Sequence, residues 1–542
     1  MLSKNFECLV KYPTFYSYLS NPSLIDHIWS NLDIRSHSFV FDSPVADHLP
    51  CISIFDTDVI DREFKISFRD FSAKNIKLCT DNIVNDIAQL RAYLDILNTI
   101  DDKVLYLTIW IETTVDKYFP YKSKTVCRRR LMAPWINSKI INLINKKHQL
   151  FRDFKNKLIT YSSFSSYAKK LKILLKKLYL RYNRQSLNEY KFDMKKKWSF
   201  INEMMGRSSS DTPIEIKVSN DICTDTDIIL KLFNEFFKDI PDKLKSKLSP
   251  SNFNYNNLIE NNIFSFFLKP IRPAEVISVT SEMKNNSKNS KIPVKFIKII
   301  IPHLGSILSD LFNKCISASY FPDMFKVATV IPLHKNNERT ELSNYRPISL
   351  LTCIAKIFEK LLFDRLYEFF MRNHLICDNQ FGFVRGRTTS HAAIHLTNFC
   401  SSAFEENKFA LSVFIDFSKA FDCVERELLL DKLSRYGVRG PPLELLRSYM
   451  SDRKQRVRIT DSNGKQCYSD LVDITGAVAQ GSSLGPLFYL IFSNEIPKLF
   501  PGAHVTLYAD DLVISMCGDD MTCLEGEMNS HLSTLLDWAN LG

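Results

Sequence analysis

Two stretches of sequence decide the fold: LSVFIDFSKAF at residues 411–421 and TLYADDLVISM at residues 506–516. In the first stretch, an apolar run typical of a strand ends at Asp416. In the second, Asp510 and Asp511 lie between two apolar arms, which predicts two strands joined by a turn. Adjacent carboxylates flanked by hydrophobic strands are costly unless a cation compensates their charge. We therefore expect the strands to bring the three aspartates together.

A divalent metal is the usual form of this compensation. Mg²⁺ prefers a few carboxylates together with water and phosphate oxygens. Two Mg²⁺ ions held about 4 Å apart can activate a 3′-hydroxyl and stabilise a leaving pyrophosphate. The alternative is a polar turn whose aspartates lie in solvent. The apolar strand that ends at Asp416, upstream of Asp510 and Asp511, favours the metal site.

The composition is that of a large basic chain with enough apolar residues for several cores. The chain has 542 residues, a formal net charge of +11 and 45% hydrophobic residues, which excludes disorder throughout. No apolar stretch reaches the roughly 18 residues of a membrane helix, and the N-terminus lacks the apolar run of a signal peptide, so we expect no secretion. The 13 cysteines form no C-x-x-C motif, which predicts reduced thiols in the cytosol or nucleus.

The basic excess is concentrated in one segment. Residues 121–200 hold 22 lysines and arginines against three acidic residues, a net charge of +19. From about residue 135 to 205 the pattern is helical, with leucines at i, i+3, i+4 and i+7 counted from Leu171. Such a segment attracts polyanions, and nucleic acid is the first candidate partner. The alternative is a solvated basic helix without a partner.

Three further patterns predict elements upstream of the aspartates. The β-branched run VATVIPLH at residues 327–334 predicts a strand, and CIAKIFEKLLFDRLYEFFMR at 353–372 predicts an amphipathic helix. Residues 225–330 are predicted to be helices, interrupted by a loop at Asn285–Asn289 and again at Pro302.

Five sequence blocks, in this order, resemble the reverse transcriptase domain of non-LTR (LINE-like) retrotransposons. They are NYRPISLLTCIAKIFEKLL (344–362), QFGFVRGRTT (380–389), LSVFIDFSKAFDCVERELLLDKL (411–433), GAVAQGSSLGPLFYLIF (476–492) and TLYADDLVI (506–514). The resemblance implies an α+β fold, a right-hand polymerase with fingers and an antiparallel palm sheet covered by helices. It implies RNA-directed DNA synthesis from a primed 3′ end, with an RNA template, a DNA primer or target and deoxynucleoside triphosphates as partners.

The resemblance also implies roles at the metal site. Asp416, Asp510 and Asp511 match the catalytic, metal-binding carboxylates. The backbone carbonyl of Phe417 matches a further ligand of the two Mg²⁺ ions, for which Mn²⁺ is an alternative. Phe421 matches the bulky residue under the sugar, whose ring excludes a 2′-hydroxyl by sterics alone.

Four more residues match the nucleotide site. Gln480 and Gly481 match the loop that lies along the incoming nucleotide and the template. Lys335 and Arg346 match basic residues of the fingers that hold the triphosphate, a task that suits the point charge of lysine and the bidentate fork of arginine. The alternative for these two is a surface position without a ligand.

The N-terminus carries a second resemblance. LIDHIWSN (24–31) and SPVADHLPCISIF (43–55) are similar to the end of the apurinic-type endonuclease that precedes the polymerase in such elements. Asp47 and His48 match an Asp-His pair that supports phosphodiester hydrolysis there. Because the front of that fold, with its acidic metal ligand, is not in the sequence, we interpret the pair as vestigial.

These interpretations predict four domains. Residues 1–55 are a C-terminal remnant of an endonuclease-like domain, 56–210 a mixed and then basic helical linker, 211–324 a helical region leading into the fingers, and 325–542 the fingers and palm. The resemblance leaves the thumb and primer grip missing, so we expect a chain truncated at both ends that extends primers poorly. The alternative function is a catalytically silent nucleic-acid-binding remnant. The family's substrate implies the nucleus.

Overall fold

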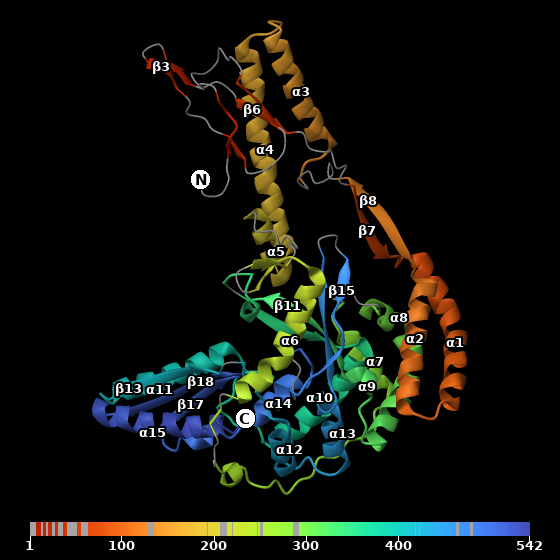
Figure 1. Ribbon diagram of the computed structural model, residues 1–542, viewed down its shortest axis with the longest axis vertical. Coiled ribbons are helices and arrows are strands. Elements are labelled where there is room, and N and C mark those ends of the chain that lie inside the picture. Colours follow the sequence, from red (N-terminus) through yellow and green to blue (C-terminus); the bar gives the residue numbers. More distant parts are fainter. Residues whose placement is uncertain are drawn as a thin grey trace. The chain divides into compact units, whose positions relative to one another are not determined.

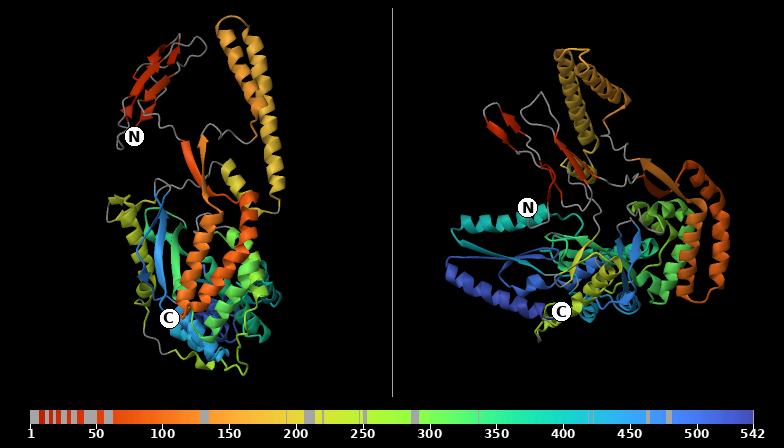
Figure 2. Two further views of the ribbon diagram at one scale, coloured as in Figure 1. Left: turned by 90° about the vertical axis from the view of Figure 1, so that its right-hand side faces the viewer. Right: turned by 45° about the horizontal axis from the view of Figure 1, so that its top comes forward.

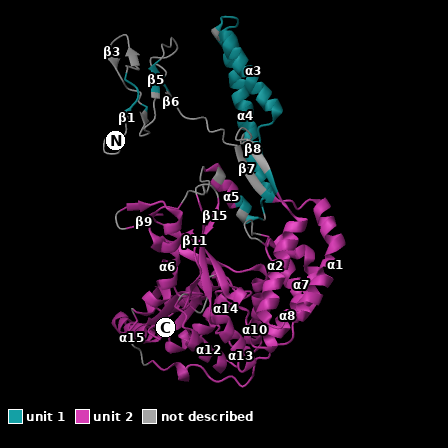
Figure 3. Ribbon diagram, turned by 45° about the vertical axis from the view of Figure 1, so that its right-hand side comes forward, with its two compact units in different colours: residues 1–68, 122–197 teal, residues 69–121, 198–542 magenta. Residues whose placement is uncertain are grey.

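The structure is a computed structural model (Figure 1), and it describes the chain apart from short segments and single residues. The segments outside the description are 1–6, 12–14, 18–19, 24–27, 31–35, 41–50, 56–62, 128–134, 192, 206–213, 219–220, 247, 250–252, 286–291, 336, 418, 422, 462–464, 477–480 and 542. Asp47, His48 and Gln480 therefore lie outside the described residues. The chain forms two compact units (Figure 3), which we describe separately.

The first unit comprises residues 1–68 and 122–197. Its strands form two-stranded pairs, β1 with β4, β2 with β3, β5 with β6 and β7 with β8. The strands are β1 (Glu7–Cys8), β2 (Phe15–Ser17), β3 (Ser20–Ser23), β4 (Trp29–Ser30), β5 (Ser36–Val40), β6 (Cys51–Phe55), β7 (Glu63–Arg69) and β8 (Tyr121–Cys127), the last two reaching the boundary of the unit.

The remainder of the first unit is helical, as the basic pattern predicts. Helices α3 (Ser138–Lys155) and α4 (Tyr161–Glu189) pack against each other. The next helix, α5 (Met194–Met204), begins in the first unit and ends in the second. Each of the first two helices begins at a side-chain cap: the side chain of Asn137 accepts a hydrogen bond from the backbone of α3, and that of Thr160 does the same for α4. Such caps satisfy backbone N–H groups that have no partner within the helix.

The second unit comprises residues 69–121 and 198–542 and contains two main sheets. The larger sheet has the order β12–β11–β14–β15, with β16 also paired to β14. Strand β11 pairs antiparallel with β12 and parallel with β14. The strands are β11 (Val327–His334), β12 (Tyr345–Leu350), β14 (Lys454–Thr460), β15 (Gln466–Tyr468) and β16 (Val472–Asp473), with a separate pair of β9 (Ile216–Val218) and β10 (Asp221–Cys223).

The smaller sheet is antiparallel and has the order β13–β18–β17. It consists of β13 (Phe409–Asp416), β17 (His504–Tyr508) and β18 (Asp511–Gly518), so the strands predicted around the aspartates are confirmed. Helices α11 and α15 cover its two faces, as the views in Figure 2 show. In β18 the apolar side chains of Leu512, Ile514 and Met516 are buried at every second position, because successive side chains of a strand point to opposite faces.

Helices surround both sheets. The α-helices are α1 (Ala73–Ile96), α2 (Ile100–Tyr118), α6 (Thr226–Lys245), α7 (Pro273–Glu282), α8 (Val294–Ser317), α9 (Asp323–Lys326), α10 (Cys353–Arg372), α11 (Thr389–Glu405), α12 (Arg426–Arg435), α13 (Pro441–Met450), α14 (Gly485–Phe492) and α15 (Met521–Ala539). Short 3-10 helices occur at η3 (Tyr255–Asn257), η4 (Leu342–Asn344) and η5 (Ile496–Leu499). The strand predicted at 327–334 and the helix predicted at 353–372 are both confirmed.

The prediction of a helix break at Pro302 is wrong. Helix α8 runs through this proline, although proline cannot donate the backbone hydrogen bond that an interior position requires. The reason is burial: α8 has 13 buried residues, including Phe296, Leu304 and Phe312. Burying one such side chain contributes roughly 1.5–3 kcal/mol, so together they outweigh the roughly 3 kcal/mol that proline costs inside a helix.

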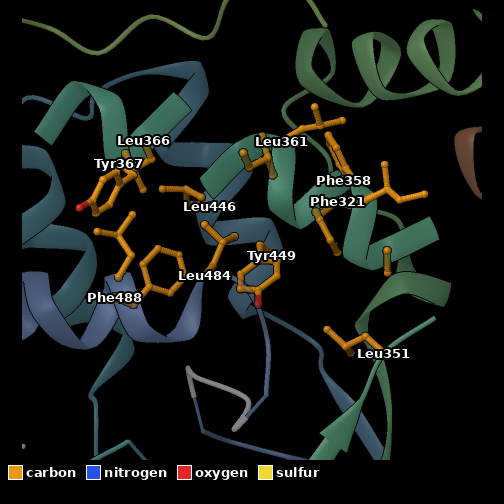
Figure 4. Packing of buried hydrophobic residues seen from close by; sticks show 14 of the residues in the cluster. Phe321, Leu351, Phe358, Leu361, Leu366, Tyr367, Leu446, Tyr449, Leu484 and Phe488 are labelled. Carbon is orange, nitrogen blue, oxygen red and sulfur yellow. The ribbon is translucent and has the colours of Figure 1, made fainter. Parts of the chain in front are cut away.

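One hydrophobic core extends from α1 and α2 to α15, and a second lies between α6 and the larger sheet. Figure 4 shows the centre of the first core, where the ring of Phe358 on α10 stacks on that of Phe321 at 5.4 Å. The ring of Tyr449 meets Phe321 edge-on at 4.9 Å, and Leu484 and Phe488 pack nearby. The core therefore joins α10, α13 and α14 into one support for both sheets.

The fold is a mixture of helix and sheet, as predicted. Among the helices that the structure describes, none is both long and apolar enough to cross a membrane. The four predicted domain boundaries stay predictions.

Candidate active site

Three aspartates meet at one end of the smaller sheet. Asp416 is the last residue of β13 and is the register partner of Asp511, the first residue of β18. Tyr508, the last residue of β17, is also paired with Asp511. The tight turn between β17 and β18 consists of Ala509 and Asp510, and Ala509 has φ +58°. The antiparallel pairing thus brings together carboxylates that lie far apart in the sequence.

The three carboxylates repel one another. The pKa of Asp511 is raised, first by burial and then by the negative charges of Asp510 and Asp416. Within the part of the chain that the structure describes, no lysine or arginine forms an ion pair with any of the three. A cation bound here would therefore meet negative charge that no ion pair of the described residues compensates.

Carboxylate oxygens are the ligands that Mg²⁺ prefers, so the donor set fits this ion. Among the described residues, however, no group of three or more His, Cys, Asp or Glu side chains is arranged to hold a metal ion. The strand register nevertheless sets Asp416 opposite Asp511, with Asp510 in the adjoining turn.

Two phenylalanines lie close to the aspartates. The ring of Phe421 stacks on Tyr489 of α14 at 4.9 Å and meets Phe383 edge-on at 6.0 Å. The pKa of Tyr489 is raised, first by burial and then by negative charges that include those of Asp510 and Asp511. The ring of Phe417 packs on Trp538 of α15 at 6.1 Å.

Gly481 lies against the larger sheet. Gly481 has φ +104°, and a Cβ atom at this position would lie 2.9 Å from the backbone oxygen of Ser349 in β12. Only glycine fits such a conformation and such a close approach. Two residues later, the backbone N–H of Ser483 donates a hydrogen bond of 3.0 Å to Oε2 of Glu359.

Glu359 is a fully buried carboxylate on α10. Its Oε1 accepts a hydrogen bond of 2.8 Å from the Tyr449 hydroxyl. Burial raises the pKa of Glu359, while the Ser483 N–H and the positive charge of Arg453 act in the opposite direction. Arg453 is 1% exposed, and its Nε and Nη2 atoms have no hydrogen-bond partner among the residues that the structure describes.

The two basic candidates lie on the other sheet. Lys335 follows β11 directly, and its backbone N–H donates to the backbone oxygen of Asn344 at 2.9 Å. Arg346 is in β12, as the register partner of Leu333. Both basic side chains are exposed, and neither is in an ion pair within the described chain.

Comparison with protein families identifies the region that carries these residues. Residues 333–541 match the family described as "Reverse transcriptase (RNA-dependent DNA polymerase)". These residues form a reverse transcriptase domain. It contains the three aspartates, Phe421, Gly481 and both basic candidates.

Curated relatives extend the similarity. The chain is 28% identical over 288 residues to the probable RNA-directed DNA polymerase from transposon BS of Drosophila melanogaster, covering 50% of this chain and 30% of that protein. It is 26% identical over 318 residues to the RNA-directed DNA polymerase from mobile element jockey of the same species, covering 55% and 34%. Identity is 30% over 234 residues with the putative 115 kDa protein in type-1 retrotransposable element R1DM of that species, covering 43% and 22%. The chain thus spans about a third or less of these relatives. The resemblance to reverse transcriptases of non-LTR retrotransposons is confirmed.

The sequence interpretation missed several residues that support the reverse transcriptase domain. Glu359 is an acidic residue on an otherwise apolar stripe with Ala355, Leu362 and Leu366, and this spacing could have marked it as buried. Gln380 is 2% exposed and contacts the aspartate turn. No sequence pattern indicates that contact, because its partner is a backbone N–H group.

Proposed function

We propose that this chain is an RNA-directed DNA polymerase of a non-LTR retrotransposon that joins a nucleotide to a primer 3′-hydroxyl. The single observation that carries the proposal is the register of β13 with β18, which sets Asp416 opposite Asp511. The third carboxylate, Asp510, lies in the adjoining turn. In this proposal the β13–β18–β17 sheet with α11 and α15 is the palm, and the β11–β12 hairpin belongs to the fingers.

The metal site would be formed by the side chains of Asp416, Asp510 and Asp511 and the carbonyl of Phe417. Mg²⁺ bound there, or Mn²⁺ in its place, would lower the pKa of the primer hydroxyl and neutralise charge on the leaving pyrophosphate. The aspartates would hold this ion from the end of β13 and from the turn and start of β18. Because the raised pKa of Asp511 arises from burial and neighbouring negative charge, a bound cation lowers that pKa again.

The nucleotide would be held by residues from both sheets. Lys335 and Arg346 are exposed, so they can contact a triphosphate. Phe421 is fixed by its packing on Tyr489, and a fixed ring can exclude a 2′-hydroxyl by sterics. Gln480 and Gly481 belong to the loop proposed to lie along the incoming nucleotide and the template.

Metal-dependent nucleotide binding by the purified chain tests the proposal. Wild-type protein should bind a fluorescent deoxynucleoside triphosphate in the presence of Mg²⁺, and Asp510→Asn should weaken this binding at least about tenfold, because it removes one metal-binding charge. Asp519→Asn is the matched control, since Asp519 lies beyond the opposite end of β18. Equal loss in both variants, or binding that does not depend on metal, would sink the assignment.

Primer extension on an RNA template measures the activity itself. The expectation that the chain by itself extends primers poorly stays a prediction. Robust synthesis of long products would show it to be wrong and would support the polymerase proposal directly.

A second candidate function is binding of RNA or DNA by the basic helices. Seven basic side chains of α4 are exposed, and none is in an ion pair within the described chain. They are Lys169, Lys170, Lys172, Lys176, Lys177, Arg181 and Arg184. This surface could serve the polymerase or act alone in a catalytically silent protein. Nucleic-acid binding that survives Asp510→Asn, in a chain whose wild type binds no nucleotide, would favour the silent protein.

We further propose that the protein acts in the nucleus, where a DNA target is available. Fluorescence microscopy of the tagged chain tests this, and exclusion from the nucleus would contradict it. The interpretation of residues 1–55 as an endonuclease remnant stays a prediction, because Asp47 and His48 lie outside the described residues.

A further inference from the structure

A short segment of the QFGF block lies beside β17, next to the aspartate turn. Gln380 forms a parallel bridge with Leu507. The backbone N–H of Phe381 donates to the Leu507 oxygen at 2.8 Å, and the Leu507 N–H donates to the Asn379 oxygen at 2.9 Å. The side-chain amide of Asn379 donates to the Val505 oxygen at 2.8 Å. The segment therefore extends the pairing of β17 on the side away from β18.

The side chain of Gln380 reaches the turn itself. Its Oε1 accepts hydrogen bonds from the backbone N–H of Ala509 at 2.9 Å and from that of Gly382 at 2.8 Å. The residue is only 2% exposed, so water does not offer Ala509 a ready substitute. Ala509 directly precedes Asp510 and has φ +58°, a conformation that is unfavourable for an alanine. The hydrogen bond from Gln380 stabilises this conformation.

Gly382 makes this close approach possible. A Cβ atom at position 382 would lie 2.2 Å from the backbone nitrogen of Ala509 and 2.9 Å from its Cα. Any other residue would push the QFGF segment away from the turn, because those contacts are with backbone that cannot rotate aside. Gln380 and Gly382 therefore both lie against the backbone of Ala509.

We propose that Gln380 is a positioning residue for the metal-binding aspartates, acting through the backbone of Ala509. The inference rests on the proposed polymerase function. By fixing the residue before Asp510, Gln380 holds the two-residue turn and keeps the register that pairs Asp511 with Tyr508. The same Asp511 is paired on its other side with Asp416 of β13. A shift of one residue in that register would turn Asp511 to the other face of the sheet.

Loss of the acceptor oxygen tests the inference. In Gln380→Met the side chain keeps its length and loses both hydrogen bonds. We expect hydrogen exchange of peptides covering 505–512 to be about tenfold faster, the factor that corresponds to one lost hydrogen bond. Mn²⁺ binding, followed by electron paramagnetic resonance, should weaken severalfold. Gln380→Glu, which retains an oxygen at this position, should keep the slow exchange of 505–512.

Gln455→Met is the matched control. Gln455 is 5% exposed and its amide donates to Asn234, so it is a buried glutamine on the larger sheet. This variant should lower thermal stability as much as Gln380→Met does and leave both the exchange of 505–512 and Mn²⁺ binding unchanged. If Gln455→Met weakens Mn²⁺ binding equally, the effect of Gln380 is merely structural and the inference fails.

The outcomes separate the inference from the proposed function. Unchanged exchange in Gln380→Met overturns the inference, and so does faster exchange with unchanged Mn²⁺ affinity. A wild-type chain that binds no Mn²⁺ overturns the proposed metal site, whereas the exchange result still decides whether Gln380 holds the turn. If Gln380→Met does not fold, exchange at the Ala509 amide of the wild type decides: an unprotected amide there contradicts the hydrogen bond.

Discussion

The basic helix α4 and the aspartate end of the smaller sheet carry opposite charge and are built in opposite ways. In α4 the basic side chains are exposed and, within the described chain, free of ion pairs. At the sheet, the turn that holds Asp510 is fixed by strand pairing on one side and by Gln380 on the other. The basic residues of α4 can attract a phosphate backbone through their total charge, because a phosphate is attracted wherever it lies near them. In the proposed metal site the aspartates depend on geometry, because one ion would have to be reached from β13 and from the turn between β17 and β18.

This comparison teaches which substitutions each region tolerates. Replacing one lysine of α4 removes one positive charge among several. Replacing a buried residue that supports the domain removes every hydrogen bond that this residue makes. The predictions below test this difference, beginning with the largest expected effect.

Removal of the buried Glu359 should have the largest effect. In Glu359→Ala the Tyr449 hydroxyl and the Ser483 N–H lose their acceptor, and the buried guanidinium of Arg453 loses a nearby negative charge. Because each buried polar group left without its partner costs about 1–3 kcal/mol, we expect the free energy of unfolding to fall by about 2–5 kcal/mol, measured by urea denaturation. Glu427→Ala is the control: its 2.7 Å pair with Arg447 is exposed, so the loss should stay below about 1 kcal/mol. Similar losses in the two variants would contradict the supporting role of Glu359.

Neutralisation of α4 should weaken nucleic-acid binding without changing the fold. Exchange of Lys169, Lys170, Lys172, Lys176 and Lys177 for glutamine should lower the affinity for duplex nucleic acid and reduce the slope of log K against log salt by about 0.9 for each lysine that contacts a phosphate. Filter binding at several salt concentrations measures both quantities. The same five positions changed to arginine keep the charge and should leave the slope intact. An unaltered slope in the glutamine variant would favour a helix that serves only as scaffold.

Phe421→Ala should relax the discrimination between sugars. The Phe421 ring packs against Tyr489 and Phe383. Its removal should therefore leave space where the ring was. We expect ribonucleotide binding to improve about tenfold relative to deoxynucleotide binding, in line with the discrimination that one small group provides. Competition for a fluorescent nucleotide measures the ratio. Phe399→Ala, where the ring packs on His504 at 4.6 Å, should leave it unchanged. Unchanged selectivity in Phe421→Ala would place the sugar gate at another residue.

The smallest effect concerns pH. The pKa of Asp511 is raised above its ordinary value of 3.8, so the folded chain holds this proton more tightly than the unfolded chain. The contribution of this group to stability is therefore fully present below that ordinary value and is lost as pH rises through the raised pKa. Asp511→Asn should accordingly be more stable than wild type at neutral pH, with the difference vanishing in acid.

Denaturation of both proteins at several pH values measures this difference. Mg²⁺ should reverse its sign, because the ion stabilises only the charged wild-type site. A wild-type protein that is more stable than Asp511→Asn at neutral pH without metal would contradict the repulsion among the aspartates.

Much of the fold could be predicted from local patterns. Alternating and β-branched residues indicated β11, β13, β17 and β18, because side chains of a strand alternate between two faces. The apolar residues of α10 recur with the period of a helix, and this pattern predicted the helix. The pattern failed at Pro302, where a local rule about backbone hydrogen bonds competes with burial along the whole of α8.

The sequence alone indicated the local features of this protein: an aspartate at the end of a strand, an aspartate pair at a predicted turn, a basic helical segment and the blocks that resemble a reverse transcriptase. These features are local, because residue type, charge and short-range periodicity do not depend on what packs against them. Only the tertiary structure decided that Asp416 pairs with Asp511 and that Glu359 supports the loop at Ser483. Those contacts join residues that are distant along the chain, often through backbone groups that every residue possesses. The spacing of residues along the sequence does not determine which distant groups meet, because the packing of the core brings them together.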